Sequence, residues 1–373
     1  MIRFVFRFLR VIVVVFVIAL GILALVISHD SPCTTAQDPG ESATRMKAIT
    51  YSCYGPPEVL RLEHVEKPGM GDDQVLVKVR AAAVNPLDWH FMRGSPYIMR
   101  LGSGIGAPTD PRLGVDFAGV VEAVGKDVRK FKPGDEVFGG ADGALAQFVA
   151  VREGRALALK PARLTFEQAA GINIAGITAL QALRDEGGIR AGQKVLINGA
   201  SGGVGTFAVQ IAKSFGAEVT GVCSTRNVEL VRSLGADHVI DYTREDFATG
   251  GTRYDLIVDM VGNRGLLEMK SALKPDGRLV IVGGAEGNWV GPMSGAIKAF
   301  FVSPFVRQHM GMMLAHPSAG DLGFLGQLVD AGKLTPVIDR TYPLEETAQA
   351  IRYLEEGRAR GKVVISIAPT EGS

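Results

Sequence analysis

The chain opens with a long apolar segment that no polar residue interrupts. The run Val11–Ile27 follows Arg3, Arg7 and Arg10, and it is just long enough to cross a bilayer, which needs about 17–25 residues. The pattern predicts a single transmembrane anchor over residues 1–30. Arginines before the run favour an N-terminus inside the cell and the rest of the chain outside.

A short polar stretch follows the anchor. Residues 31–45 contain proline and glycine, which is typical of a flexible linker. Met46 begins the globular part and is itself a natural start. Three alternatives to a permanent anchor therefore stay open. The segment is a signal peptide that is removed, although no clean cleavage site follows, or a buried core helix, or an appended segment or gene-start artefact before the enzyme proper. The sequence leaves open whether residues 1–45 belong to the mature protein and which side of the membrane the rest faces.

Between Met46 and Thr165 the pattern is that of short strands. Valine-rich, partly alternating segments separated by glycine and proline predict a compact β-rich, barrel-like domain over residues 46–165. The expected strands are 74–84, 114–125, 134–140 and 143–151.

At Thr165 the pattern changes to alternating helices and strands. Thr165 and Gln168 fit a capping box, which predicts a helix to about residue 184. Further strands are expected at 194–198, 218–223, 238–241, 255–260 and 278–283, with helices at 202–216 and 227–235. Such alternation predicts an α/β fold with a doubly wound parallel sheet over residues 166–316.

The last segment, residues 317–373, predicts two helices, near 320–331 and 345–357, and a strand at 362–367. We expect that strand to return to the first domain or to the edge of the sheet. Before this segment lies a stretch rich in Met and Phe, residues 287–314. It is either a flap over the substrate site or a packing or dimer surface. As a flap it would offer Trp289, Phe300, Phe301 and Met310 to a lipophilic chain.

Charge and cysteine content exclude several classes of protein. The 40 basic side chains nearly balance the 39 acidic ones, so nothing indicates a nucleic-acid partner. The cysteines Cys33, Cys53 and Cys223 are scattered, without a Cys-x-x-Cys pair or a neighbouring His cluster. Their spacing argues against a disulfide framework and against a structural zinc lobe.

The strongest chemical signal is a glycine-rich turn between a predicted strand and a predicted helix. Small residues there let the backbone approach a pyrophosphate, and the helix N-terminus offers free N–H groups. Strand, turn, helix and second strand occur in order, which favours a dinucleotide site over a merely structural turn. The predicted contacts are Ala200, Ser201, Gly202, Gly203, Val204 and Gly205.

The end of the next strand predicts which dinucleotide binds. NAD enzymes carry Asp or Glu there for the ribose hydroxyls, whereas this chain has Ser224, Thr225 and Arg226. Hydroxyls and a guanidinium suit a 2′-phosphate, so we expect NADPH. The alternative for Arg226 is a solvated charge at the start of a helix.

Four separated motifs resemble one enzyme family. These are AAAVNPLDW (81–89), GASGGVG (199–205), LGADHVIDY (234–242) and ARGKVVI (359–365). They resemble the quinone oxidoreductase branch of the medium-chain dehydrogenase/reductases, in particular the group of the chloroplast-envelope quinone oxidoreductase homologue and the mitochondrial reticulon-interacting reductase. The resemblance covers about residues 46–368. It implies a GroES-like catalytic domain, a Rossmann domain, an active site in the cleft between them, and a homodimer.

The resemblance also indicates where the zinc-dependent branch of the family carries its metal ligands. Its Cys position corresponds to Asn85, its His–Glu pair to Val115 and Asp116, and its third ligand lies near Ile174. One carboxylate cannot hold a tetrahedral zinc ion, so we expect no metal. Hydrogen bonds would then polarise the substrate, which suits a quinone or an α,β-unsaturated ketone or aldehyde.

The family assigns further candidate residues. Asn85 is expected to hydrogen-bond the cofactor or the substrate oxygen, unless it is only an Asn-Pro turn residue. His90 as a proton relay and Tyr97 as a donor to a carbonyl complete the predicted catalytic set, with surface or packing roles equally open. The resemblance implies cofactor contacts for Tyr242 at the adenine, Gly283 and Gly284 at the nicotinamide, and Lys362 at a phosphate. For Lys362 a plain strand-edge role is the alternative.

Three functions compete. The first is reduction of a quinone or enone by NADPH. The second is a zinc-free alcohol dehydrogenase, which would lack the strong Lewis acid or base that alcohol oxidation needs. The third is a non-catalytic scaffold that binds NADPH.

Overall fold

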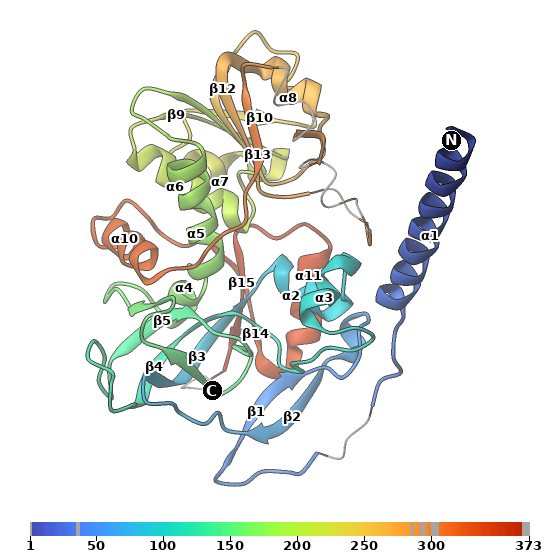
Figure 1. Cartoon of the computed structure of the whole chain (residues 1–373). Coiled ribbons are helices and arrows are strands. Elements are labelled where there is room, and N and C mark those ends of the chain that lie inside the picture. The colour runs from blue at the N-terminus through green and yellow to red at the C-terminus, as the bar shows by residue number, and fades with distance from the viewer. Residues whose placement is uncertain are drawn as a thin grey trace.

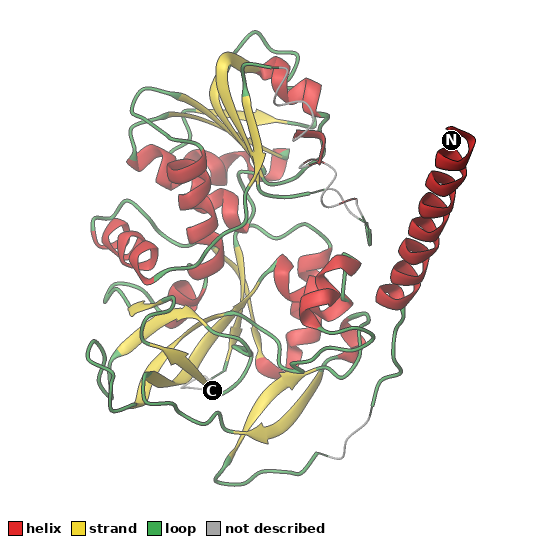
Figure 2. Ribbon diagram, in the orientation of Figure 1, coloured by secondary structure: helices red, strands yellow, loops and turns green. Residues whose placement is uncertain are grey.

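The computed structural model describes residues 2–34, 38–284, 287–289, 291, 295, 297–299 and 306–367, and side chains in the first helix only for Phe6 and from Val11 onward. Two large β-sheets lie toward opposite ends of the body, with helices between and around them (Figures 1 and 2). The long helix α1 (Ile2–Ser28) stands clear of this body (Figure 1). The fold class is α/β, as the sequence predicts.

One sheet has six parallel strands in the order β10-β9-β8-β11-β12-β13. Its strands are β8 (Lys194–Asn198), β9 (Glu218–Cys223), β10 (His238–Asp241), β11 (Tyr254–Asp259), β12 (Leu273–Ile281) and β13 (His309–Met312). Helices α6 (Gly203–Ser214), α7 (Val228–Ser233) and α8 (Leu266–Ala272) connect strands of this sheet. The strand order reverses between β8 and β11, which is where Rossmann sheets bind their ligands.

The other large sheet is mostly antiparallel, in the order β14-β15-β3-β4-β5-β7, with β6 beside β3. Its strands are β3 (Gln74–Val84), β4 (Asp116–Val124), β5 (Glu136–Gly140), β6 (Phe148–Arg152), β7 (Leu157–Leu159), β14 (Ile338–Pro343) and β15 (Lys362–Ser366). A separate pair is formed by β1 (Arg45–Thr50) and β2 (Arg61–Glu66). Strand β15 pairs antiparallel with β3, so the end of the chain returns to the first sheet, as expected.

The helix expected from Thr165 to about residue 184 is divided into three pieces. The Thr165 side chain accepts from Gln168 N at 3.2 Å and caps α4 (Phe166–Ala170). Then come α5 (Asn173–Gln181) and a π-helical turn (Ala182–Glu186). Almost every residue of α5 is buried, and one hydrophobic cluster runs from β3 through α5 to β8. This helix therefore joins the two sheets into one core.

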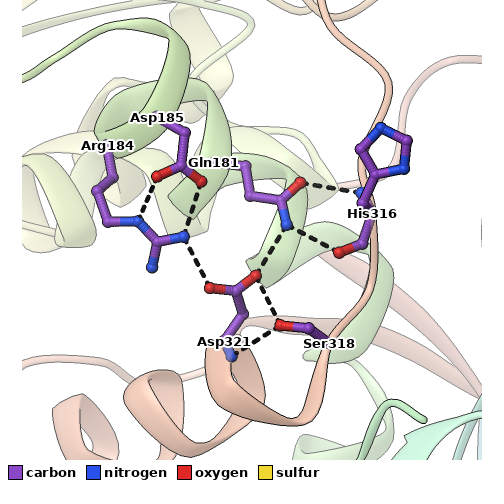
Figure 3. Close-up of polar contacts among 6 residues, drawn as sticks. All are labelled: Gln181, Arg184, Asp185, His316, Ser318 and Asp321. Carbon is purple, nitrogen blue, oxygen red and sulfur yellow. Dashed lines mark hydrogen bonds and ion pairs between the residues drawn. The ribbon is translucent and has the colours of Figure 1, made fainter.

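A polar cluster fixes the chain where it leaves the parallel sheet and enters α10 (Ala319–Asp330) (Figure 3). The amide of Gln181 donates to His316 O and accepts from His316 N, both at 2.9 Å. Asp321 accepts from Gln181 and from Arg184, each at 2.8 Å. These bonds hold α10 against α5. The remaining helices that the argument needs are α2 (Pro86–Arg93), α3 (Arg100–Ser103) and α11 (Thr347–Glu355).

The described part of the segment after α1, the predicted linker, contacts the body at several points. Cys33 and Cys53 form a disulfide with their Cα atoms 4.8 Å apart. The argument against disulfides is therefore wrong for this pair, because folding brings together two positions whose spacing carries no signal. Ser31 N also donates to Gly106 O at 2.8 Å.

Arg100 is the second tie between α1 and the body. Its side chain is 2% exposed and donates to the carbonyls of Ile27 and His29, both at 3.1 Å. It also pairs with Asp30 at 2.8 Å. A cation at the C-terminal end of a helix satisfies free carbonyls and the helix dipole, so Arg100 caps the predicted anchor.

Candidate active site

A cleft of about 860 Å³ lies between the parallel sheet and the first sheet. The loops after β8, β9 and β11 form one wall, and Asn85 and Lys362 form part of the other. This is the side of the parallel sheet at which the strand order reverses, the expected place for a dinucleotide.

The glycine-rich loop sits at the bottom of this cleft. Gly202 is the N-cap of α6, so the free N–H groups of that helix point into the loop. A Cβ on Gly205 would lie 2.1 Å from Gly199 O, so only glycine lets the helix approach the loop so closely. Five of the six predicted loop residues line the cleft, whereas Ala200 is buried behind them.

The ribose end of the cleft is cationic. Ser224, Thr225 and Arg226 line it as predicted, and Arg226 donates to the backbone oxygen of Arg358 at 2.6 Å. Arg358 lines the same cleft, so two arginine residues contribute to its lining. Among the described residues that line the cleft there is no Asp or Glu.

One carboxylate near this end is not among the described residues that line the cleft. Asp241, at the end of β10, accepts from the hydroxyls of Thr225 and Thr243. Those hydrogen bonds, led by the one from Thr225, lower the pKa of Asp241. With its oxygens occupied, Asp241 does not offer the ribose contact that an NAD enzyme needs.

The other end of the cleft holds a buried polar cluster. Lys362 Nζ donates to Asn85 Oδ1 and lies 3.3 Å from Asp116 Oδ2. Asp116 also accepts from Asn85 Nδ2 and Asn173 Nδ2, both at 2.9 Å, and from Ile174 N at 3.1 Å. Every one of these polar side chains is at most 3% exposed.

Asp88 lies directly behind this cluster. It is fully buried, and its Oδ2 accepts from Asn85 N at 2.6 Å in the capping box of α2. Burial raises the pKa of Asp88 to about 7, and the negative charge of Asp116 adds to that effect. The carboxyl therefore fixes the backbone of Asn85 while it titrates near neutral pH.

Comparison with known proteins identifies the family. Residues 71–162 match the alcohol dehydrogenase GroES-like domain, and residues 234–365 match the family described as zinc-binding dehydrogenase. The chain is 38% identical to the 2-methylene-furan-3-one reductase of Solanum lycopersicum, over 87% of this chain and 80% of the relative. It is 36% identical to the mitochondrial NAD(P)H oxidoreductase RTN4IP1 of Homo sapiens, over 87% and 90%.

Solved structures agree with the sequence comparison. The quinone oxidoreductase from Coxiella burnetii is 33% identical, with a TM-score of 0.77, and covers 87% of this chain and all of its own. The chain belongs to the quinone oxidoreductase branch of the medium-chain dehydrogenase/reductases. It is therefore an oxidoreductase with a nicotinamide cofactor.

The cleft of this family member fits a nicotinamide dinucleotide. Gly202 and Gly203 line the cleft without a side chain, which leaves the loop backbone open to a pyrophosphate. The hydroxyl of Ser224 and the guanidinium of Arg226 line the end where the adenosine ribose would lie, whereas the Thr225 hydroxyl already donates to Asp241. When bound, the cofactor would supply a hydride at the end where Asn85 and Lys362 lie.

The metal positions of the zinc-dependent branch do not fit zinc in this chain. Asn85, Asp116 and Ile174 do meet in space, as the resemblance implies, but the carboxylate already accepts from four donors. Within the described part of the chain, no three His, Cys, Asp or Glu side chains converge to hold a metal ion. An ammonium group lies beside the one carboxylate instead.

Two of the three predicted catalytic residues lie outside the described lining of the cleft. His90 is half-buried, with its Nδ1 2.6 Å from Ser95 O. Burial lowers the pKa of His90, so its ring is neutral at pH 7. Tyr97 packs its ring edge-on against Trp289 and lies over the guanidinium of Arg100.

The predicted cofactor contacts Gly283 and Gly284 are also outside this lining, although Gly283 packs against Met260. A Cβ on Gly283 would lie 2.1 Å from Met260 O, and Met260 and Val261 form that wall of the cleft. Tyr242 lines the cleft, as expected. Of the expected flap residues, Trp289 is 46% exposed and Met310 is buried on β13, whereas Phe300 and Phe301 lie outside the described residues.

Sequence reasoning missed several lining residues. Asn198 and Asn263 face each other at 3.2 Å across the ends of β8 and β11. A polar residue at the end of a buried strand was the available signal for Asn198. Arg358 gave no local signal, because it reaches the cleft only after α11 has packed on the first sheet.

Proposed function

We propose that the chain is a membrane-anchored reductase that transfers hydride from NADPH to a quinone or to an α,β-unsaturated ketone or aldehyde. One observation supports it above all. A single cleft joins a dinucleotide loop at one end to the hydrogen-bonded cluster of Asn85, Asp116 and Lys362 at the other. Such a cluster polarises a carbonyl by hydrogen bonds, which suffices for an electron-poor acceptor.

The preference for NADPH follows from the charge of the ribose end. Arg226 and Arg358 supply two cations, and the nearest carboxylate, Asp241, is bound to hydroxyls. A relative that is 38% identical carries the name NADPH-dependent alkenal/one oxidoreductase, chloroplastic, from Arabidopsis thaliana. Its cofactor and acceptor are those proposed for this chain.

Membrane anchoring is the second part of the proposal. The window Val11–Ser28 of α1 has a mean hydropathy of 3.3, and only 6% of it is buried. A helix of that length and composition is unfavourable in water and favourable in a bilayer. The homodimer that the family resemblance implies stays a prediction, as do catalytic roles for His90 and Tyr97.

An activity assay tests the proposal. The full chain is kept in detergent with a metal chelator. In one set of assays it is mixed with NADPH or NADH and with a quinone or an enone, and in another with NADP⁺ and an alcohol. We expect rapid loss of NADPH absorbance with quinone or enone and at least tenfold lower kcat/KM with NADH. Arg226→Gln should raise the KM for NADPH about tenfold and leave that for NADH unchanged. Its control is Arg190→Gln, an exposed arginine outside the described cleft lining.

The outcomes separate the competing functions. Alcohol oxidation without reduction of quinone or enone would favour the zinc-free alcohol dehydrogenase. Tight NADPH binding without any turnover would favour a non-catalytic NADPH-binding protein. Equal kcat/KM with NADH and NADPH would remove the role given to Arg226.

A further inference from the structure

The side chain of Lys362 takes an unexpected direction. Lys362 is the first residue of β15. The N–H of Gly361, the residue before it, donates to Ser201 O at 3.0 Å, so the backbone at Gly361 and Lys362 lies beside the dinucleotide loop. The side chain then passes two glycines. A Cβ on Gly171 would lie 3.3 Å from its Cγ, and a Cβ on Gly203 would lie 3.4 Å from its Cδ. Gly171 lies between α4 and α5, and Gly203 begins α6. Because neither glycine has a side chain, they leave a channel through which the lysine side chain passes.

The channel leads the ammonium away from the loop. Lys362 Nζ ends between Asn85 Oδ1 and Asp116 Oδ2, and the residue is 3% exposed. A lysine ammonium has three N–H donors, and the described residues supply acceptors for two of them. Lys362 and Asn85 both line the cleft, and no described residue accepts from the third donor.

The surroundings of the ammonium are those of a cation site. The metal ligands of the zinc-dependent branch correspond to Asn85, Asp116 and Ile174. In this chain the carboxylate of Asp116 accepts hydrogen bonds from Asn85 Nδ2 and Ile174 N, so the three positions meet. Lys362 supplies the positive charge at that place. Its partner Asp116 is fully buried and is held by Asn173 and by Ile174 N, so the ammonium is fixed in place.

We propose that Lys362 is a catalytic residue that takes the place of the metal: it donates a hydrogen bond to the carbonyl oxygen of the acceptor and then transfers its proton to that oxygen. This inference rests on the proposed function. The hydride, with its electron pair, forms a C–H bond at the β-carbon of an enone, and the C=C electrons move toward the carbonyl.

The proton balance closes on the lysine. An Nζ–H bond breaks as the O–H bond of the enol forms, and the enol converts to the saturated carbonyl compound. The acceptor is reduced by two electrons, and NADPH is oxidised to NADP⁺. The neutral amine regains its proton from water that enters the cleft when product leaves.

Two other roles for Lys362 make different predictions. A lysine that binds a cofactor phosphate, as the family resemblance implies, would weaken NADPH binding when removed. A purely structural ion pair with Asp116 would lower stability without any specific effect on the chemical step. The proposed role predicts slow chemistry with NADPH affinity retained.

The test uses the full chain in detergent with Lys362→Ala, the double variant Lys362→Met with Asp116→Asn, and the wild type. NADPH affinity is measured by cofactor fluorescence, and a single turnover with an enone is followed by stopped flow. We expect a 100- to 1,000-fold slower single turnover in both variants, which is the usual size of a lost acid or oxyanion donor. The dissociation constant for NADPH should stay within threefold. The double variant removes both charges, so it answers the question even if an unpaired Asp116 unfolds the single variant.

Rescue by a small amine is the readout that a structural role would not give. Ethylammonium fits the space left by Lys362→Ala and should raise the single-turnover rate of that variant at least tenfold. Tetramethylammonium, which has no N–H, should leave that rate unchanged. The control is Lys160→Ala, since Lys160 is a similarly buried lysine paired with Glu136 outside the described cleft lining. It should change stability and show no rescue.

The remaining outcomes overturn one proposal or the other. Loss of NADPH affinity with an unchanged turnover rate means a phosphate contact, and an unchanged rate in both variants ends the catalytic role. An inactive wild type with every quinone and enone removes the proposed function itself, and this inference with it.

Discussion

Asp88 shows at the scale of one residue how burial changes the chemistry of an ordinary helix-capping side chain. An exposed aspartate at this position of a capping box is simply ionised. Here the side chain is fully buried, and its Oδ1 has no hydrogen-bond partner among the described groups. Burial raises its pKa to about 7, so its protonated form is the one that the folded state favours below neutral pH.

A pH dependence of stability follows. An unfolded aspartate has a pKa of about 3.9, so between about pH 4 and pH 7 the folded state binds more protons than the unfolded one. The free energy of unfolding therefore falls as the pH rises through that window. Asp88→Asn cannot ionise, and it should gain about 2–4 kcal/mol relative to wild type between pH 4.5 and pH 8. Denaturant titrations at the two pH values measure this change.

Asp110→Asn is the control for that experiment. Arg112 lowers the pKa of Asp110, so this carboxylate stays ionised over the whole window, and its removal should leave the pH slope of the wild type unchanged. Identical slopes in wild type and Asp88→Asn would show that Asp88 is ionised throughout and that the pKa assigned to it is wrong.

The same scale shows where site prediction from sequence works and where it stops. The loop residues and Arg226 line the cleft because a strand–turn–helix places its own backbone, which a local pattern encodes. Lys362 and Tyr97 have long side chains whose direction depends on distant partners. Asn85 and Asp116 draw the lysine inward, and Arg100 and Trp289 hold the tyrosine.

At the scale of elements, four strands are predicted with the right ends, whereas the predicted ends of β4, β5, β6 and β12 differ from the structure by up to five residues. The bounds of β3, β8, β9 and β10 agree with the sequence pattern, and β3, β8 and β9 do so because their buried apolar runs end at turn residues. The short strands β7, β13 and β14 have mixed or exposed residues, so neighbouring strands, and not their own pattern, determine them. At the break between α4 and α5 the side chain of Lys362 passes Gly171, a contact between distant residues that no local pattern shows.

The contact between α5 and α10 gives a prediction at this scale (Figure 3). Burial alone would raise the pKa of Asp321, but hydrogen bonds from Gln181 and Arg184, with one from Ser318, hold it below its usual value. Asp321→Ala leaves the buried Gln181 amide without one partner, which costs about 2–3 kcal/mol of unfolding free energy. Denaturant unfolding measures the loss, and NADPH affinity should change less than threefold.

Asp330→Ala is the matched control, since Asp330 is exposed at the other end of the same helix. It should change the free energy of unfolding by less than about 0.5 kcal/mol. A loss in Asp321→Ala no larger than that of the control would show that the cluster does not hold α10 against α5.

At the scale of the whole molecule, the predicted anchor and the segment after it are joined to the body by a buried arginine and by a disulfide. Arg100 binds the carbonyls at the end of α1, and the Cys33–Cys53 disulfide closes the following segment onto the body. A disulfide persists in an oxidising compartment and not in the cytosol. The arginines before α1 independently favour an exported body by the positive-inside rule. Both observations favour a cleft on the non-cytosolic side.

Thiol counting in membranes tests that orientation. The full chain is trapped with acid, denatured, and treated with a maleimide polymer before and after reduction. Without reductant only Cys223, the free cysteine, should react, and after reduction all three should. Cys223→Ser should shift those counts to none and two. The crosslink spans 20 residues, so its loss in Cys33→Ser should also lower the free energy of unfolding by about 3 kcal/mol. Three reactive thiols before reduction would mean that the pair is reduced in the cell, and the body would then face the cytosol, where NADPH is supplied.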